Sequence, residues 1–209
     1  MTPRDIERFF SALSRAWPHR TDIILIGGGV AVLEGSTRPT FDLDFEFRLA
    51  GPPAPEDADV FAGAVRQAEA ASGVEGQFTT DIGSWSPIAL PPWRNSARRW
   101  KCFGAITVKR LDPAVYVVTK LRRGSSGDFA DLILVARRHH VPWKNVARLC
   151  GTATRLSPSS TSLLAFTRRV MFLFREHGRD VWGPGFDPAR AAELFRRNSG
   201  RRRTRSSRG

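Results

Sequence analysis

Cysteine is scarce in this sequence, because Cys102 and Cys150 are the only two among 209 residues. Two cysteines so far apart build neither a disulfide framework nor the spacing of a zinc site, as is usual in a reducing compartment. Long apolar runs are missing as well, since no stretch reaches the roughly 18 apolar residues of a membrane span. The N-terminus also lacks a secretory pattern. We therefore expect a soluble, cytoplasmic protein.

Acidic residues are absent from residues 196–209, which contain seven arginines. Without these arginines the net charge of the chain falls from +13 to +6. An arm of this composition binds phosphate backbones without reading sequence, and we predict such contacts for Arg201, Arg202 and Arg203. The alternative is a solubilising terminus that has no partner.

A strand, a turn and a short helix are predicted over residues 22–34. The apolar residues 23–26 favour a buried strand, three glycines follow, and the apolar residues after them favour a helix. A glycine turn that leads into a helix offers backbone N–H groups to an anion such as phosphate. We predict this role for Gly28 and Gly29. A dinucleotide-binding unit is the rival interpretation, but the third glycine of its fingerprint is missing.

A second strand is predicted over residues 41–47, where acidic and apolar residues alternate. This period of two places Asp42, Asp44 and Glu46 on one face of the strand. Neighbouring carboxylates are costly unless a positive charge lies between them, and hard oxygen ligands favour Mg²⁺, with Mn²⁺ as a substitute. The sequence thus predicts a metal held by Asp42 and Asp44 beside a phosphate-binding turn, which describes a site for a nucleoside triphosphate.

These residues resemble the DNA polymerase β-type nucleotidyltransferase superfamily, especially its small prokaryotic branch of abortive-infection and toxin–antitoxin enzymes. The resemblance covers about residues 20–135. It rests on the glycine pair and on two further segments, Arg38-x-Thr40-x-Asp42-x-Asp44 and Lys120-Leu121-x-Arg123 with Asp128-x-x-Asp131.

The resemblance implies an α+β fold with a small mixed sheet, flanking helices and a C-terminal helical subdomain. We place a nucleotidyltransferase-like domain at 1–150, the helical subdomain at 151–195 and a basic tail at 196–209. The implied reaction is Mg²⁺-dependent transfer of a nucleoside monophosphate from a nucleoside triphosphate to an acceptor hydroxyl, with release of pyrophosphate.

The resemblance also implies roles for residues outside the acidic strand. Arg38 and Thr40 would bind the nucleotide, and Lys120 would neutralise charge on the triphosphate. Asp128 and Asp131 would hold the lysine in position. The alternatives are a solvated surface lysine and, for Asp128, an ordinary helix N-cap.

A third acidic residue usually completes the metal site in this superfamily. Asp81, on a strand predicted over 77–82, is the favoured candidate and would act as base toward the attacking hydroxyl. Glu46 competes with it because it shares the strand face of Asp42 and Asp44. Asp81 has an ordinary alternative as the cap of the Gly83-Ser84 turn.

The acceptor is predicted from residues 83–100, where tryptophans alternate with Arg94, Arg98 and Arg99. Such interleaving suits stacking on bases together with phosphate contacts, although tryptophans in a loop also simply pack on the body. We expect RNA as the acceptor, for example a tRNA 3′ end, in a toxin–antitoxin or phage-defence setting with a cognate antitoxin as a possible partner protein. The alternatives are a protein hydroxyl, a small molecule such as an aminoglycoside, or a nucleic-acid-binding module without turnover.

The remaining pattern predicts elements that the structure can be compared with. We expect one strand and several helices, over residues 102–108 for the strand and 2–16, 114–123, 128–140, 160–177 and 187–195 for the helices.

Overall fold

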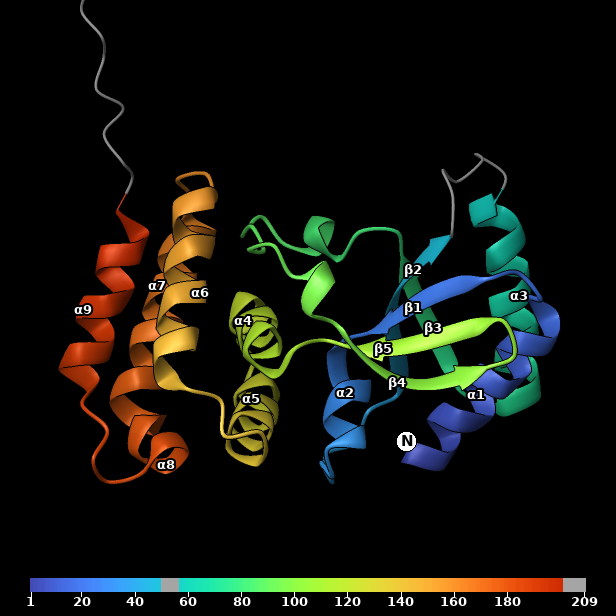
Figure 1. Ribbon diagram of the computed structural model, residues 1–209, viewed down its shortest axis with the longest axis horizontal. Helices are drawn as coiled ribbons and strands as arrows, with labels where there is room; N and C mark the ends of the chain where they lie inside the picture. The colour runs from blue at the N-terminus through green and yellow to red at the C-terminus, as the bar shows by residue number, and fades with distance from the viewer. Residues whose placement is uncertain (50–56, 201–209) are drawn as a thin grey trace, which may run out of the picture.

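The described part of the chain, residues 1–49 and 57–200 of a computed structural model, is an α+β structure with a mixed sheet and flanking helices. This confirms the predicted fold class at that level. Figure 1 shows the sheet in one half of the molecule and a group of helices in the other, with α4 and α5 between them. No helix in the described ranges is both long and apolar enough to cross a membrane.

Five strands form the sheet in the order β3-β2-β1-β5-β4. The pairs β1–β2 and β4–β5 are antiparallel, whereas β1–β5 and β2–β3 are parallel. The central strand β1 contains most of the apolar run predicted to form a buried strand. The strand bounds are β1 Thr21–Leu25, β2 Asp42–Leu49, β3 Glu75–Thr79, β4 Arg98–Phe103 and β5 Ile106–Arg110.

One face of the sheet packs on α1 (Pro3–Ala16) and α3 (Asp57–Ser72) through aromatic rings. Phe45 of β2 lies 5.9 Å from Phe9 and 6.3 Å from Phe61, measured between ring centroids. Because side chains alternate along a strand, the burial of Phe45 on this face turns Asp44 and Glu46 to the other. The apolar face of β2 therefore fixes where its carboxylates point.

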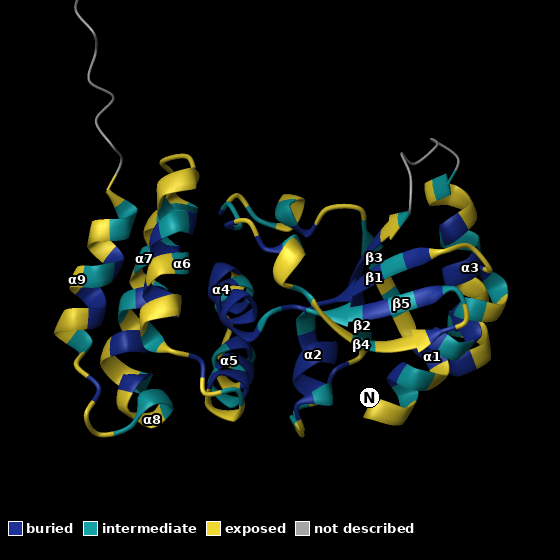
Figure 2. Cartoon of the chain, viewed as in Figure 1, coloured by how far each residue is buried: buried dark blue, intermediate teal, exposed yellow. Residues whose placement is uncertain are grey.

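The other half of the molecule is a helical group around its own apolar core. Helix α4 joins the two halves, because Val115 packs in the sheet core while Leu121 packs in the helical core. Figure 2 shows α4 as largely buried. The helices are α2 Gly27–Leu33, α4 Pro113–Arg123, α5 Ser126–Arg138, α6 Trp143–Leu156, α7 Thr161–Phe172, α8 Gly178–Trp182 and α9 Pro188–Ser199, with a π-helical turn over Leu173–His177.

Four expected elements differ from the structure. The strand predicted over 77–82 ends at Thr79, so Asp81 lies beyond β3 and caps a short 3₁₀ helix. The single strand predicted over 102–108 is wrong: β4 and β5 form a hairpin that turns at Gly104, whose φ of +54° favours glycine. The helix predicted over 160–177 is regular only to Phe172. The last helix does not end at Phe195 but continues to Ser199, so that Arg196 and Arg197 belong to α9 rather than to a tail. Arg201, Arg202 and Arg203 lie outside the described residues.

Candidate active site

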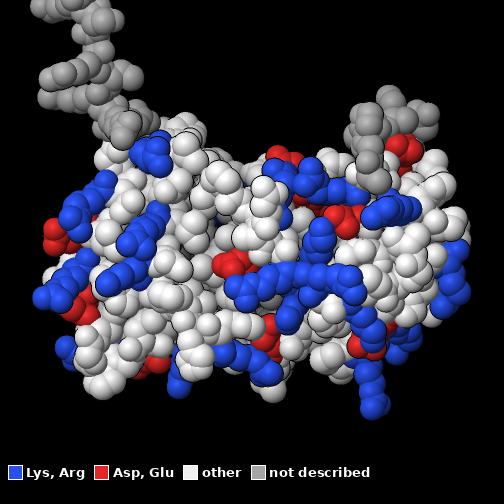
Figure 3. Space-filling view, in the orientation of Figure 1, with Lys and Arg blue, Asp and Glu red and all other residues white. Residues whose placement is uncertain are grey.

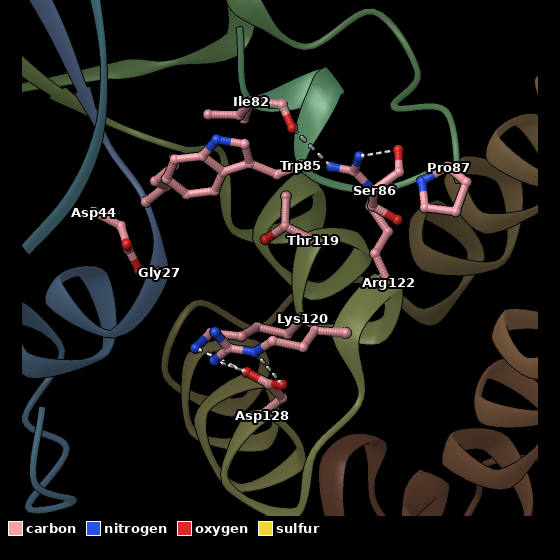
Figure 4. A pocket seen from close by; sticks show the side chains of 12 residues that line it. Gly27, Asp44, Ile82, Trp85, Ser86, Pro87, Thr119, Lys120, Arg122 and Asp128 are labelled. Atoms are coloured by element: carbon pink, nitrogen blue, oxygen red, sulfur yellow. Dashed lines mark hydrogen bonds and ion pairs between the residues drawn. The ribbon is translucent and has the colours of Figure 1, made fainter. Parts of the chain in front are cut away.

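A pocket of about 300 Å³ lies where the end of the sheet meets α4. Ile26 and Gly27 from the start of α2 form one wall together with Asp44 of β2. Figure 4 shows Arg122, Ser86 and Pro87 on the opposite side, with Lys120 and Asp128 between the two walls. The volume lies at the lower end of the range for small-molecule sites.

Asp44 is buried in this pocket. Asp42, two residues earlier on the same face of β2, is half-buried. Within residues 1–49 and 57–200 neither carboxylate makes a hydrogen bond or an ion pair. Burial, and then the charge of Asp42, raise the pKa of Asp44 to about 6, although Arg123 and Lys120 oppose the shift. The pair is therefore short of positive charge.

The three glycines allow α2 to pack closely on the acidic strand. Gly27 has φ +61°, and a Cβ at this position would overlap the Asp44 carboxylate. A Cβ on Gly28 would lie 2.6 Å from Thr40 Cγ2, and one on Gly29 would lie 2.8 Å from Leu43 Cδ1. Gly27 is the glycine that lines the pocket. Gly28, Gly29 and Thr40 are buried in the packing behind it.

Lys120 points from α4 into a cluster of acids. Its Nζ lies 2.7 Å from Asp131 Oδ2 and 3.2 Å from Asp128 Oδ1, and its side chain is only 4% exposed. This burial excludes a solvated surface lysine. Arg38 donates to Asp131 through Nε at 3.2 Å and through Nη2 at 2.6 Å. Its side chain therefore faces the acidic cluster and does not line the pocket.

Asp128 has two structural functions in this cluster. It forms a capping box with Ser125 at the start of α5, and it accepts a bidentate pair from Arg123 at 2.6 and 2.8 Å. Burial alone would raise the pKa of Asp128, but the hydrogen bonds from Arg123 and Ser125 and the charge of Lys120 hold it well below the usual range. Asp128 stays ionised and keeps Lys120 and Arg123 at the pocket wall.

The two candidates for a third acid are tied to each other by Arg94. Glu46 is fully buried, accepts from the backbone N–H of Ile82 at 2.9 Å and pairs with Arg94 at 3.1 Å. Asp81 accepts from the backbone N–H of Gly83 at 2.9 Å and pairs with Arg94 at 2.7 Å. In the structure Asp81 thus has the capping contact that its alternative role requires, and Arg94 bridges two acids.

The basic residues expected to contact nucleic acid have different surroundings. Arg98 is exposed and pairs with Asp112 at 3.1 Å, and Arg99 is exposed on the same strand. Of the neighbouring tryptophans, Trp93 is buried in the core, whereas Trp85 is 47% exposed and lines the pocket. One tryptophan therefore packs on the body and the other remains available for stacking.

Sequence reasoning missed Arg122, which is buried at the far wall of the pocket. Its guanidinium donates to the backbone carbonyls of Ile82, Gly83 and Ser86. Arg122 follows Thr119 by three positions and so lies on the same helix face. That spacing was the only available signal, because nothing local shows what the face packs against.

The donor set of the pocket fits a hard cation brought in with a nucleotide. Asp42 and Asp44 offer carboxylate oxygens, and Mg²⁺ commonly takes one or two carboxylates together with substrate phosphates and water. The described ranges hold no group of three histidine, cysteine or acidic residues that could bind a metal without such a partner. Comparison of the chain with protein-family models, with curated proteins and with solved structures finds no match.

Proposed function

We propose that this protein is a magnesium-dependent nucleotidyltransferase that moves a nucleoside monophosphate from a nucleoside triphosphate to an acceptor hydroxyl. The observation that carries the proposal is the pair Asp42 and Asp44, two acids on one strand face beside a pocket, with no cation partner in the described structure. Unpaired buried carboxylates cost stability, and a bound cation removes that cost.

Asp42 and Asp44 would hold the cation, which would supply Lewis acidity and would lower the pKa of the attacking hydroxyl. In the reaction the acceptor oxygen bonds to the α-phosphorus and loses its proton to water. The bond from the α-phosphorus to the bridging oxygen breaks, and pyrophosphate leaves.

Lys120 and Arg123 would neutralise charge on the triphosphate. An ammonium has three N–H donors, and Lys120 donates one of them to Asp131, while Asp128 lies within ion-pair distance at 3.2 Å. A donor remains for a phosphate oxygen, held in a fixed direction by the two carboxylates. Because it is already ordered, this cation stabilises developing charge without reorganising.

Trp85 would stack on the nucleobase at the pocket mouth, since it is half-exposed and lines the cavity. Base–aromatic stacking contributes about 1–3 kcal/mol per base and tolerates any base. This arrangement gives affinity without selecting one nucleoside triphosphate.

RNA is the acceptor that the charge of the chain favours. The net charge is +13, and in Figure 3 lysine and arginine side chains outnumber acidic ones over both halves of the molecule. A polyanion gains affinity from such a surface, whereas a neutral small molecule gains none. A protein hydroxyl is the second candidate for the acceptor.

Incubation with labelled nucleoside triphosphates, Mg²⁺ and total RNA or cell lysate tests the proposal. We expect the natural protein to label RNA. Asp44→Asn should label RNA at a rate at least about a thousandfold lower. Asp22→Asn, which alters an exposed acid of β1 paired with Lys109, is the matched control and should keep full activity. Label on RNA from both variants alike would contradict the assignment of Asp44.

A further inference from the structure

A second pocket of about 310 Å³ continues the first one beyond Arg122. The two pockets share part of one wall, formed by Ser86, Pro87 and Arg122. The rest of the second pocket is formed by α7 of the helical group, through Thr161, Ser162, Ala165 and Arg169. The second pocket therefore lies next to the one that contains Asp44.

The second pocket is positively charged, since two arginines and no acid line it. Arg122 is buried, with 9% of its surface exposed. Its Nε has no hydrogen-bond partner in the described structure. Its other nitrogens bond to neutral backbone carbonyls, and no carboxylate pairs with it in the described structure. Burial lowers the pKa of Arg122 to about 10, and the charge of Asp81 offsets only part of this shift.

Arg169 gives the pocket its second cation. Its Nη1 donates to the backbone carbonyls of Leu121 and Arg122 at 3.3 and 2.8 Å, so the side chain lies across the last turn of α4. Across residues 1–49 and 57–200 Arg169 has no acidic partner either. Two guanidinium groups with neutral partners thus face one cavity, and a planar guanidinium suits a phosphate better than a lysine does.

We propose that the second pocket binds a backbone phosphate of an RNA acceptor, through Arg122 and Arg169. The choice of RNA rests on the proposed function. In that function the acceptor hydroxyl of the RNA lies beside Asp44, and the neighbouring nucleotides of the RNA strand lie at the second pocket. The first pocket contains the acids Asp44 and Asp128 as well as the cations Lys120 and Arg123, so it suits phosphates that are bound to a metal. The second pocket takes a phosphodiester directly.

Arg169→Gln tests this proposal against Arg168→Gln, a neighbouring exposed arginine that lines neither pocket. Both variants remove one positive charge from the same helix. The probe is a fluorescent single-stranded RNA of about 12 nucleotides, titrated with the full chain at several salt concentrations. We expect Arg169→Gln to weaken RNA binding roughly tenfold, the effect of one charge-assisted hydrogen bond, and to reduce the salt slope by about 0.7. Arg168→Gln should bind almost as the natural protein does.

Ser162→Asp provides a second test that does not remove a structural contact. It places a carboxylate in the pocket at the first turn of α7, where an acid favours the helix. Ala189→Asp, at the first turn of α9, is its control. Ser162→Asp should weaken RNA binding at least as much as Arg169→Gln does, whereas Ala189→Asp should leave it unchanged.

The outcomes separate this inference from the proposed function. Equal RNA affinity for each variant and its control overturns the inference, and so does an Arg169→Gln protein that loses affinity for Mg²⁺–nucleotide instead of RNA. Failure of the natural protein to label any macromolecule counts against the proposed function alone, because RNA binding is measured without turnover.

Discussion

Two pairs of aspartates lie around the same pocket and have opposite surroundings. Asp128 and Asp131 are buried and receive Lys120, Arg123 and Arg38 within 3.2 Å. Asp42 and Asp44 receive no side-chain donor in the described structure. The pKa of Asp128 is accordingly lowered, whereas that of Asp44 is raised to about 6.

The difference shows why the number of acids does not identify a metal site. A saturated pair has already satisfied its charge and serves to position cations, while an unsaturated pair has capacity left for an incoming ion. On this comparison the proposed cation would bind at β2, whereas α5 positions Lys120. Substitutions in the two pairs should have opposite effects on stability.

The largest effect on stability is expected from Asp131→Asn. It removes the charge that faces Lys120 and Arg38. Breaking a buried ion pair costs about 3–5 kcal/mol, and we expect the lower end of this range because Lys120 keeps Asp128 at 3.2 Å. Urea unfolding followed by circular dichroism measures the loss. Asp180→Asn, in an exposed pair with His177 at 3.9 Å, is the control and should change stability by less than about 0.5 kcal/mol. Equal stability of Asp131→Asn and the natural protein would show that the paired cluster is not a stabilising unit.

Lys120→Met should affect catalysis more than folding. Each aspartate keeps an arginine after this change, Asp131 with Arg38 and Asp128 with Arg123, so neither acid is left alone. Loss of the cation from the pocket should raise the barrier to transfer by roughly 3 kcal/mol. Single-turnover rates at saturating nucleotide measure this, with Lys144→Met on the surface as control. An unchanged rate would restrict Lys120 to a structural role.

Asp44→Asn should stabilise the protein, but only at higher pH. A carboxyl whose pKa is raised from 3.8 in the unfolded chain to about 6 in the folded one favours folding when protonated. The natural protein therefore loses stability as the pH rises through this window, and above it the loss is about 3 kcal/mol. Asn carries no such charge. Urea unfolding at pH 4 should give equal stabilities, and at pH 7.5 the variant should be more stable.

Saturating Mg²⁺ and nucleotide should remove that advantage, because the ion compensates the carboxylate charge of the natural protein alone. An advantage of the variant that is the same at pH 4 and 7.5 would mean that the Asp44 charge is not its cause.

Period-two alternation sufficed to predict the acidic face of β2. When the apolar residues of a strand pack on the core, the alternating residues between them must point to the opposite face. Local signals also located α4, which begins after Asp112 with Pro113 and ends at Gly124 in a left-handed conformation. These features depend on neighbours in sequence. The resemblance implied the α+β class, which the structure has, whereas the nucleotidyltransferase fold itself remains a prediction.

Features that depend on distant contacts could not be predicted from the sequence. Glu46 was a candidate ligand until Arg94, 48 residues away, was found to pair with it. The same holds for Gly27, whose place in the pocket depends on how α2 packs on β2. Arg122 likewise bonds to backbone carbonyls of the segment that starts at Ile82, 40 residues before it. Spacing along the chain carries no information about such pairings.

The smallest effect is expected from Asp42→Asn, and it tests the comparison most directly. The charge of Asp42 is the second cause of the raised pKa of Asp44, after burial. Its removal should therefore lower the pKa of Asp44 toward the usual value while leaving the part due to burial. Carboxyl carbon shifts in a ¹³C NMR titration measure this pKa, with Asp22→Asn as a control that should not move it.

Mg²⁺ binding competes with the proton on Asp44, so without nucleotide the binding of Mg²⁺ should weaken below about pH 6 in the natural protein. In Asp42→Asn this pH dependence should move to lower pH although one ligand is lost. An Asp44 pKa that is unchanged by Asp42→Asn would show that the two carboxylates do not interact and cannot hold one cation between them.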